Sequence, residues 1–231
     1  MPYFLIDRYY ILLVLPVIFA SMIINWRLKS TYSKYSKLGN SRGITGAQAA
    51  QMVLNYYGVT DVAIVPTGGN LSDCYDPTQK LIKLSEGVYN KSSIAAVGIA
   101  CHEAGHAAQH AESYAPIKIR NSILPVCNIG SSLSIPLLIA GVIFSFQPLI
   151  WVGIGFFAFT SLFQFITLPV EFNASNRALN VIESTGILSY EEKQGASKVL
   201  KMAAMTYVAS LAVSLAQLLR LILRYGGNRR R

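Results

Sequence analysis

Charged residues are scarce in this chain: they make up 13% of the 231 residues, while 52% are hydrophobic. The mean hydropathy is correspondingly high, at +0.40. A soluble globular domain carries about twice this fraction of charged residues. The composition therefore excludes an ordinary soluble globule and indicates a membrane protein.

Cysteine is also rare. The chain has 3 cysteines, Cys74, Cys101 and Cys127, and no two of them form a Cys-x-x-Cys pair. An odd and scattered set supports neither a disulfide framework nor a zinc ribbon. It fits a protein whose polar regions face a reducing compartment.

Acidic residues are few, with 11 Asp and Glu against 20 Lys and Arg, which gives a net charge of +9. Such an excess could indicate a nucleic-acid partner or a lipid surface. The basic residues cluster beside the apolar segments. We therefore expect contact with the anionic headgroups of membrane lipids and no nucleic-acid partner.

Long apolar runs take the place of charge. Three of them, 9–26, 123–146 and 149–168, are each near the roughly 20 residues that cross a hydrocarbon core. Buried helices of a soluble protein are the alternative, but three such runs favour membrane helices. No small-x-small cleavage site follows the apolar core of the first run, which predicts a retained anchor.

A fourth apolar segment, 202–223, contains Gln217 and Arg220 and leads to the basic residues Arg229, Arg230 and Arg231. A full crossing would place this basic tail outside, against the preference of positive charge for the cytoplasm. The segment either crosses at that cost or packs in or along the membrane. The charge pattern slightly favours the second alternative.

The most informative motif is His102-Glu103-Ala104-Gly105-His106. Histidines four residues apart project from one face of a helix, one turn apart, and can bind one zinc ion. Glu103 beside them can act as a general base on the attacking water. With only 3 histidines in the chain, two of them in this motif, the pattern predicts a zinc site.

A hydrolytic zinc ion has three protein ligands and one open position. His110 is an unsuitable third ligand, because on a straight helix it lies roughly 12 Å along the axis from His102. Glu171 is the better candidate, since Pro169 marks a helix start where the chain leaves the membrane and a helical hairpin would return Glu171 to the side of the motif. A first-turn Glu that complements the helix dipole is its alternative. Ser175, one turn further, could hydrogen-bond a ligand.

The motif region, 27–120, is expected to be a small α+β catalytic region of zincin type, followed by a third-ligand region at 169–201. An edge strand just before the motif helix could hold an extended peptide by backbone pairing. Within 27–120 we expect two helices: one at 47–57, with Thr45 as its cap and Gly58 after its end, and one from Ser92 or Ser93 to His110. Between them we expect strands at 62–65 and 80–84 and turns at 66–70 and 75–77.

Taken together, residues 1–231 are predicted to form a single mainly α integral membrane protein with three or four membrane helices and the small α+β region. Basic residues flank 27–120 and recur in 169–201, which predicts a cytoplasmic site. The N-terminus and the short Gln147-Pro148 turn would then lie outside.

Several segments resemble one family along most of the chain. They are 70–77, 84–89, the residues from Ser93 into the motif helix, and 169–178. The chain resembles the YugP-type neutral zinc metallopeptidases of bacterial membranes. The resemblance implies a bacterial cytoplasmic membrane, zinc ligands His102, His106 and Glu171, and Glu103 as the base.

The arrangement is also similar to the gluzincin-like proteases HtpX and the CAAX prenyl proteases, in which a Glu-x-x-Ala-Asp segment supplies the third ligand. Ser175 stands where those proteases have Asp, so the hydrogen bonding around the ligands is expected to differ. The YugP-type pattern commonly has His where this chain has Cys74.

The resulting hypothesis is a zinc-dependent endopeptidase acting on peptides or membrane proteins, in membrane protein processing or quality control. Arg177 could bind the oxyanion or a substrate carboxylate, or it could pair with Asp73, Asp76 or a lipid phosphate. The alternative from another class is a non-catalytic membrane scaffold with a structural or vestigial zinc site. Glu103 disfavours the scaffold alternative, because a structural zinc site requires no general base. Structural zinc sites also prefer four protein ligands.

Overall fold

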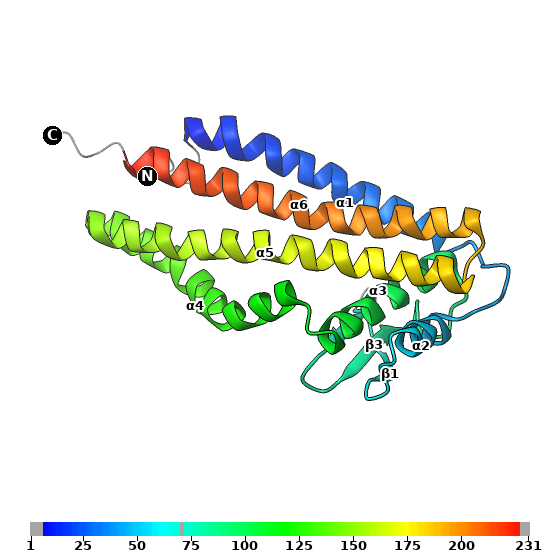
Figure 1. Ribbon diagram of the computed structural model, residues 1–231. Coiled ribbons are helices and arrows are strands. Elements are labelled where there is room, and N and C mark those ends of the chain that lie inside the picture. Colours follow the sequence, from blue (N-terminus) through cyan, green and yellow to red (C-terminus); the bar gives the residue numbers. More distant parts are fainter. Residues whose placement is uncertain (1–6, 70–71, 227–231) are drawn as a thin grey trace. The chain divides into compact units, whose positions relative to one another are not determined.

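The computed structural model describes residues 7–69 and 72–226. Arg229, Arg230 and Arg231, and the end of the predicted 66–70 turn, lie outside the described residues. Within them the elements follow one another as η2 (Tyr10–Val14, a π-helix), α1 (Leu15–Tyr35), α2 (Gly46–Tyr56), β1 (Ala63–Thr67), β2 (Cys74–Asp76), β3 (Leu81–Ser85), α3 (Ile94–Ala111), α4 (Ala115–Ile143), α5 (Gln147–Thr185) and α6 (Tyr190–Gly226) (Figure 1).

The chain divides into two compact units. The membrane unit comprises the residues up to Asn25, Ile119–Leu168 and the residues from Thr206 onward. The motif unit comprises Trp26–Lys118 and Pro169–Met205. Helices α1, α4, α5 and α6 contribute residues to both units.

Four helices among the described residues are long and apolar enough to cross a membrane, namely Tyr10–Tyr35, Ala115–Ile143, Gln147–Thr185 and Tyr190–Gly226. They expose large apolar side chains, such as Leu12 (70% exposed) and Phe144 (76% exposed). Such exposure is unfavourable in water but not against lipid tails, which are as apolar as these side chains. The predicted fold class, mainly α with membrane helices and a small α+β region, is confirmed.

Helices α4 and α5 pack antiparallel inside the membrane unit. Ser134 Oγ donates a hydrogen bond to the Gly153 carbonyl at 3.0 Å. Seven residues further along α4, a Cβ added to Gly141 would lie 2.8 Å from the backbone nitrogen of Ile150, which precedes Gly153 on α5. Small residues therefore let the two helix backbones approach closely, as is common in membrane proteins.

The predicted turn at Gln147-Pro148 is wrong. The chain turns before it, at Ser145, whose φ of 52° is left-handed, and α5 begins at Gln147. Pro148 therefore lies in the first turn of α5, where its missing N–H would have no intrahelical partner in any case.

Three segments meet at one end of the membrane unit. Gln147 Nε2 donates to the Tyr225 carbonyl at 2.8 Å, and Arg220 Nη2 lies 2.8 Å from Asp7 Oδ2. The start of the first helix, the α4–α5 turn and the C-terminal end of α6 are therefore neighbours. Arg220, which counted against a crossing by α6, is buried and paired with a carboxylate, and this pairing reduces the cost of placing it in a membrane.

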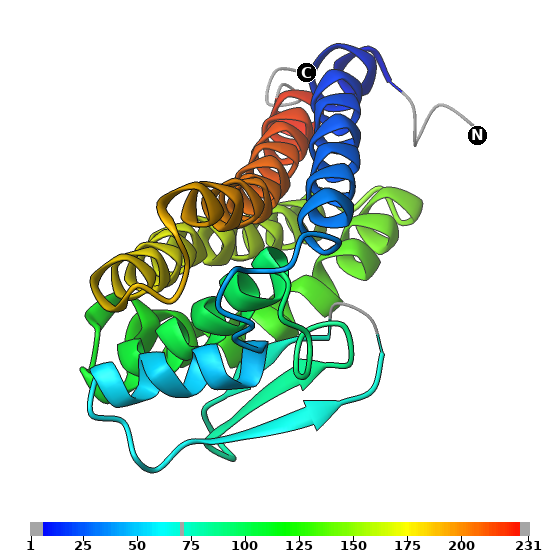
Figure 2. The same ribbon diagram turned by 90° about the vertical axis from the view of Figure 1, so that its right-hand side faces the viewer.

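The motif unit contains a three-stranded sheet in the order β1-β3-β2. Strands β1 and β3 are parallel, and β2 runs antiparallel to β3. Helices α2 and α3 lie side by side against the sheet (Figure 2). Ile82 and Leu84 alternate with half-buried residues on β3 and are fully buried in the core that the helices form with the sheet.

The helix starts follow the predicted capping chemistry. Thr45 and Gln48 form a reciprocal capping box at the start of α2, and Gly58 after its end has a φ of 65°. The Ser93 hydroxyl accepts from the Ala96 amide at 3.2 Å and caps α3. Ser93, rather than Ser92, is therefore the cap of the motif helix.

The first residues of two predicted turns belong to strands instead, and the chain turns just after them. β1 continues through Pro66, because at the edge of the sheet its missing N–H removes no necessary ladder bond. Tyr75 and Asp76 belong to β2, and the turn follows them: the Asp76 carboxylate accepts from the amides of Thr78 and Gln79 at 3.0 and 3.1 Å.

Pro169 does not start a helix. It lies inside α5, which runs without a break from Gln147 to Thr185. A proline removes one hydrogen bond from a helix, and a long helix whose flanks are held by packing can accommodate that loss. Glu171 is consequently a mid-helix residue and not a first-turn residue, which removes the helix-dipole alternative for it.

Candidate metal centre

Helix α3 holds the motif on its partly accessible side. Ala104, Gly105, Ala107 and Ala108 are buried around the half-buried His102 and His106. The absence of a side chain on Gly105 brings α3 close to α5, because an added Cβ would lie only 2.7 Å from the Ala174 carbonyl oxygen. This close approach sets the separation between the motif and α5.

Three side chains converge at this contact. His102 Nε2 and His106 Nε2 lie 3.4 and 3.7 Å from Glu171 Oε2. One ligand atom from each of the three residues lies within 4.8 Å of the others, and the Glu171 residue is only 5% exposed. The structure thus brings Glu171 to the two histidines, although it lies 65 positions after His106 in the sequence.

The other nitrogen of each imidazole is held by a protein side chain. Ser175 Oγ lies 3.1 Å from His102 Nδ1, and Gln109 Oε1 lies 3.0 Å from His106 Nδ1. Hydrogen bonds at Nδ1 fix the ring orientation and tautomer, and leave Nε2 available to a metal. Both rings are therefore oriented with Nε2 toward Glu171.

Gln109 is a site residue that sequence reasoning missed. It is fully buried, and its Nε2 donates to the Val170 carbonyl at 2.8 Å and to Asn173 Oδ1 at 2.9 Å. Gln109 therefore links His106 to α5 on both sides of Glu171. A signal was available: Gln109 lies three residues after His106 and so shares its helix face.

Glu103 is positioned by the sheet. Its Oε2 accepts a hydrogen bond from the Tyr75 amide on β2 at 2.9 Å. Because Tyr75 pairs with Ile82 at the outer strand of the sheet, its N–H is available to a group beyond the edge. The edge strand thus holds the Glu103 carboxylate beside the motif histidines on α3.

The electrostatics of the centre follow from its carboxylates. Burial lowers the pKa of His106, but contact with Glu171 and the negative charges of Glu103 and Glu171 outweigh it, so the pKa lies above its ordinary value. A metal at His106 therefore competes with a proton that is held more tightly than on an ordinary imidazole. Burial, and then the charge of Glu103, raise the pKa of Cys74, so this thiol on β2 is protonated at neutral pH.

Arg177 is engaged with groups that the sequence did not suggest. Its Nη1 lies 2.7 Å from Glu112 Oε2, its Nε donates to Asn173 Oδ1 at 2.7 Å, and its guanidinium lies 5.4 Å from the centre of the Tyr57 ring. Asp73 and Asp76 bind Ser85 and Lys83 instead of Arg177. The position of Arg177 indicates that it braces α3 against α5.

The donor set of the centre fits zinc. Two imidazole nitrogens and one carboxylate oxygen are ligands that zinc prefers, and three protein ligands leave a coordination position for water or substrate. His110, excluded as a ligand by its distance along the helix, packs its ring 5.4 Å from the ring of Tyr75 and does not belong to the group of converging ligands.

Membrane helices together with a convergent His, His and Glu group define a membrane protein with a candidate metal centre. A protein-family model described as "Putative neutral zinc metallopeptidase" matches residues 10–226. The chain therefore belongs to this family, and the resemblance to YugP-type proteins is confirmed.

The chain is 43% identical over 220 residues to "Putative membrane protease YugP" of Bacillus subtilis (strain 168), a match that covers 95% of this chain and 98% of the relative. No solved structure matches the chain.

Proposed function

We propose that this protein is a zinc-dependent endopeptidase of the membrane, of gluzincin type, with His102, His106 and Glu171 as zinc ligands and Glu103 as general base. The main support is the convergence of the three ligand atoms within 4.8 Å, from helices α3 and α5. The family membership and the name of the relative support the same reaction class.

The residues of the centre would have separate roles in the proposed reaction. A bound zinc ion would supply Lewis-acid chemistry, activating a water molecule and stabilising negative charge on a peptide carbonyl oxygen. Glu103 takes a proton from the attacking water and delivers it to the leaving amine. Ser175 and Gln109 fix the orientation of the two imidazole rings through hydrogen bonds at the Nδ1 atoms of His102 and His106.

We further propose that the substrate is a peptide or a membrane protein, cleaved in processing or quality control, and that the site faces the cytoplasm. Basic residues flank the motif unit in the sequence and support this orientation. The meeting of Asp7 with Arg220, and of Gln147 with Tyr225, supports a crossing by α6, with its C-terminal end on the same side as Asp7. Single cysteines at positions 7 and 225 can be labelled with a reagent that reaches one side of the membrane only. If α6 crosses, both positions should be labelled or both protected. Labelling of one position and protection of the other would contradict a crossing.

The test of catalysis compares two variants in native membranes. Glu103→Gln should bind zinc as the wild type does and should lose cleavage by at least about 100-fold, since it removes the proton acceptor. Glu171→Ala should lose the metal, because only two ligands are left. Equal cleavage by the wild type and Glu103→Gln would contradict the peptidase proposal and favour the scaffold alternative.

The substrate is best found by capture. The Glu103→Gln protein should retain peptides that the wild type cleaves, and mass spectrometry of co-purified material would identify them. His106→Ala is the matched control, since it removes metal binding as well. A substrate held equally by both variants would not be held through the metal centre, and this would contradict the assignment of the site.

A further inference from the structure

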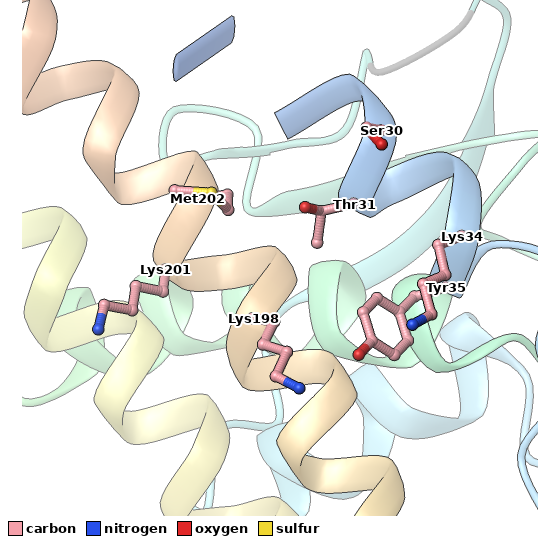
Figure 3. Close-up of a pocket in the computed structure, with 7 residues that line it drawn as sticks. All are labelled: Ser30, Thr31, Lys34, Tyr35, Lys198, Lys201 and Met202. Atoms are coloured by element: carbon pink, nitrogen blue, oxygen red, sulfur yellow. The ribbon is translucent and has the colours of Figure 1, made fainter. Parts of the chain in front are cut away.

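A cavity lies in the motif unit, and its lining shares no residue with the candidate metal centre. A cavity of about 360 Å³ is formed by α1 and α6. Helix α1 contributes Ser30, Thr31, Lys34 and Tyr35, and α6 contributes Lys198 and Lys201. Figure 3 shows Lys34 and Tyr35 on α1 beside Lys198 on α6, with Lys201 about one turn further along α6. The volume falls within the range of small-molecule sites.

The lining follows from helical spacing. Thr31, Lys34 and Tyr35 are three and four residues apart and share one face of α1, and Lys198 and Lys201 share one face of α6. The two helices are close here because α6 has Gly195 where a Cβ would lie 2.6 Å from the Tyr35 ring. The Tyr35 ring therefore packs on α6 and fixes one side of the cavity.

The cavity concentrates positive charge without a counterion. Its lining includes three lysines and no carboxylate. Within residues 7–69 and 72–226, no ion pair is formed by Lys34, Lys198 or Lys201. The nearest acidic residues of α6 in sequence are engaged elsewhere: Glu192, for instance, accepts from the Ser41 and Ser189 amides. Like charges around one cavity repel one another, and a bound anion would remove that repulsion.

Sequence hydropathy places this charge at the level of lipid headgroups. The apolar run of α1 ends at Trp26 and that of α6 begins at Met202, which also lines the cavity. Ser30 and Lys198 each lie four residues beyond these limits, or roughly 6 Å along the helix. A headgroup layer is about 5–8 Å thick on each side of the hydrocarbon core. Lys198 and Lys201 are therefore within the depth of the headgroup layer, with the apolar Met202 on the side of the acyl chains. Lys34 lies eight residues beyond Trp26, or roughly 12 Å along α1, and it belongs to the site because it lines the same cavity as Lys198.

We propose that this cavity binds the phosphate group of an anionic phospholipid, held by Lys34 and Lys198 with Lys201 adding charge, while the hydroxyl groups of Ser30 and Thr31 donate hydrogen bonds. A lipid is favoured over a soluble phosphate because membrane phospholipid is always present at this depth. The site is independent of the peptidase proposal, since none of its residues belongs to the metal centre.

The test uses the full-length protein in detergent micelles and native mass spectrometry. Phosphatidylglycerol is titrated as the anionic lipid, with phosphatidylcholine as the zwitterionic control and inorganic phosphate as a soluble competitor. The test variant is Lys34→Gln/Lys198→Gln. Its matched control, Lys29→Gln/Lys37→Gln, makes the same change in net charge at exposed lysines that do not line the cavity. The charge-conserving variant Lys34→Arg/Lys198→Arg separates loss of charge from loss of fold.

The expected result is that the test variant binds phosphatidylglycerol about tenfold or more weakly than the wild type, as the loss of two headgroup-facing charges predicts. The matched control and the arginine variant should bind within about twofold of the wild type. Equal weakening in the test variant and the matched control would overturn the site, because it would show general surface attraction. Full displacement by inorganic phosphate, at the lipid concentration used, would assign the site to a soluble phosphate and overturn the lipid.

Discussion

Replacement of Gly105 by alanine tests whether the spacing between α3 and α5 controls the metal centre. The new Cβ would lie 2.7 Å from the Ala174 carbonyl oxygen, several tenths of an ångström closer than an ordinary contact. This oxygen belongs to the backbone of α5 and cannot rotate away. The two helices therefore have to separate, and Ala174 lies directly before Ser175 and three residues after Glu171.

Two magnitudes follow. Overpacking costs about 1–3 kcal/mol, and the better helix propensity of alanine offsets about 1 kcal/mol of this, so the free energy of unfolding should fall by roughly 0–2 kcal/mol. Metal affinity should fall more clearly, because metal–ligand distances tolerate only about 0.2 Å of error. We expect the zinc dissociation constant of Gly105→Ala to rise at least about tenfold.

Gly98→Ala is the matched control, since it makes the same substitution seven residues earlier on α3, where the added Cβ would lie 3.2 Å from the Ala196 Cβ. Zinc affinity is measured by competition with a chromophoric chelator, and stability by thermal unfolding of the micellar protein. Zinc binding by Gly105→Ala that is as tight as in Gly98→Ala would refute the link between helix spacing and the centre.

Three further predictions concern the surroundings of the centre. Gln109→Ala should weaken zinc binding by about 10- to 100-fold, measured with the same chelator, while Gln51→Ala on exposed α2 surface should have no effect. Zinc at a concentration of 100 times its dissociation constant should raise the free energy of unfolding of the wild type by about 2.7 kcal/mol, and EDTA should reverse this increase. A free energy of unfolding that does not depend on zinc would contradict the presence of zinc ligands on both α3 and α5. Arg177→Gln should lower the free energy of unfolding by about 1–2 kcal/mol with zinc stoichiometry retained, since its partner Glu112 is half exposed; loss of zinc would instead place Arg177 at the metal.

Local patterns were sufficient for much of the fold. The four apolar segments, the caps at Thr45 and Ser93, and the helical spacing of His102 and His106 depend on neighbouring residues alone. The errors arose where tertiary contacts overrode a local signal. Pro169 lies inside a helix, and Tyr75-Asp76 forms a strand, because packing of α5 and pairing with β3 outweigh the turn and helix-start preferences of these residues.

The sequence by itself determined that the chain is a membrane protein and that two imidazoles, the candidate metal ligands, share one helix face with a carboxylate beside them, because hydropathy and helical periodicity are properties of short segments. Only the tertiary structure decided that Gln109 and Ser175 orient those imidazoles, that Arg177 pairs with Glu112, and that β2 holds Glu103. These contacts join residues distant in the chain or depend on the direction of a side chain. The close approach of α3 and α5 at Gly105 sets the geometry of the two contacts that join these helices, Ser175 with His102 and Arg177 with Glu112.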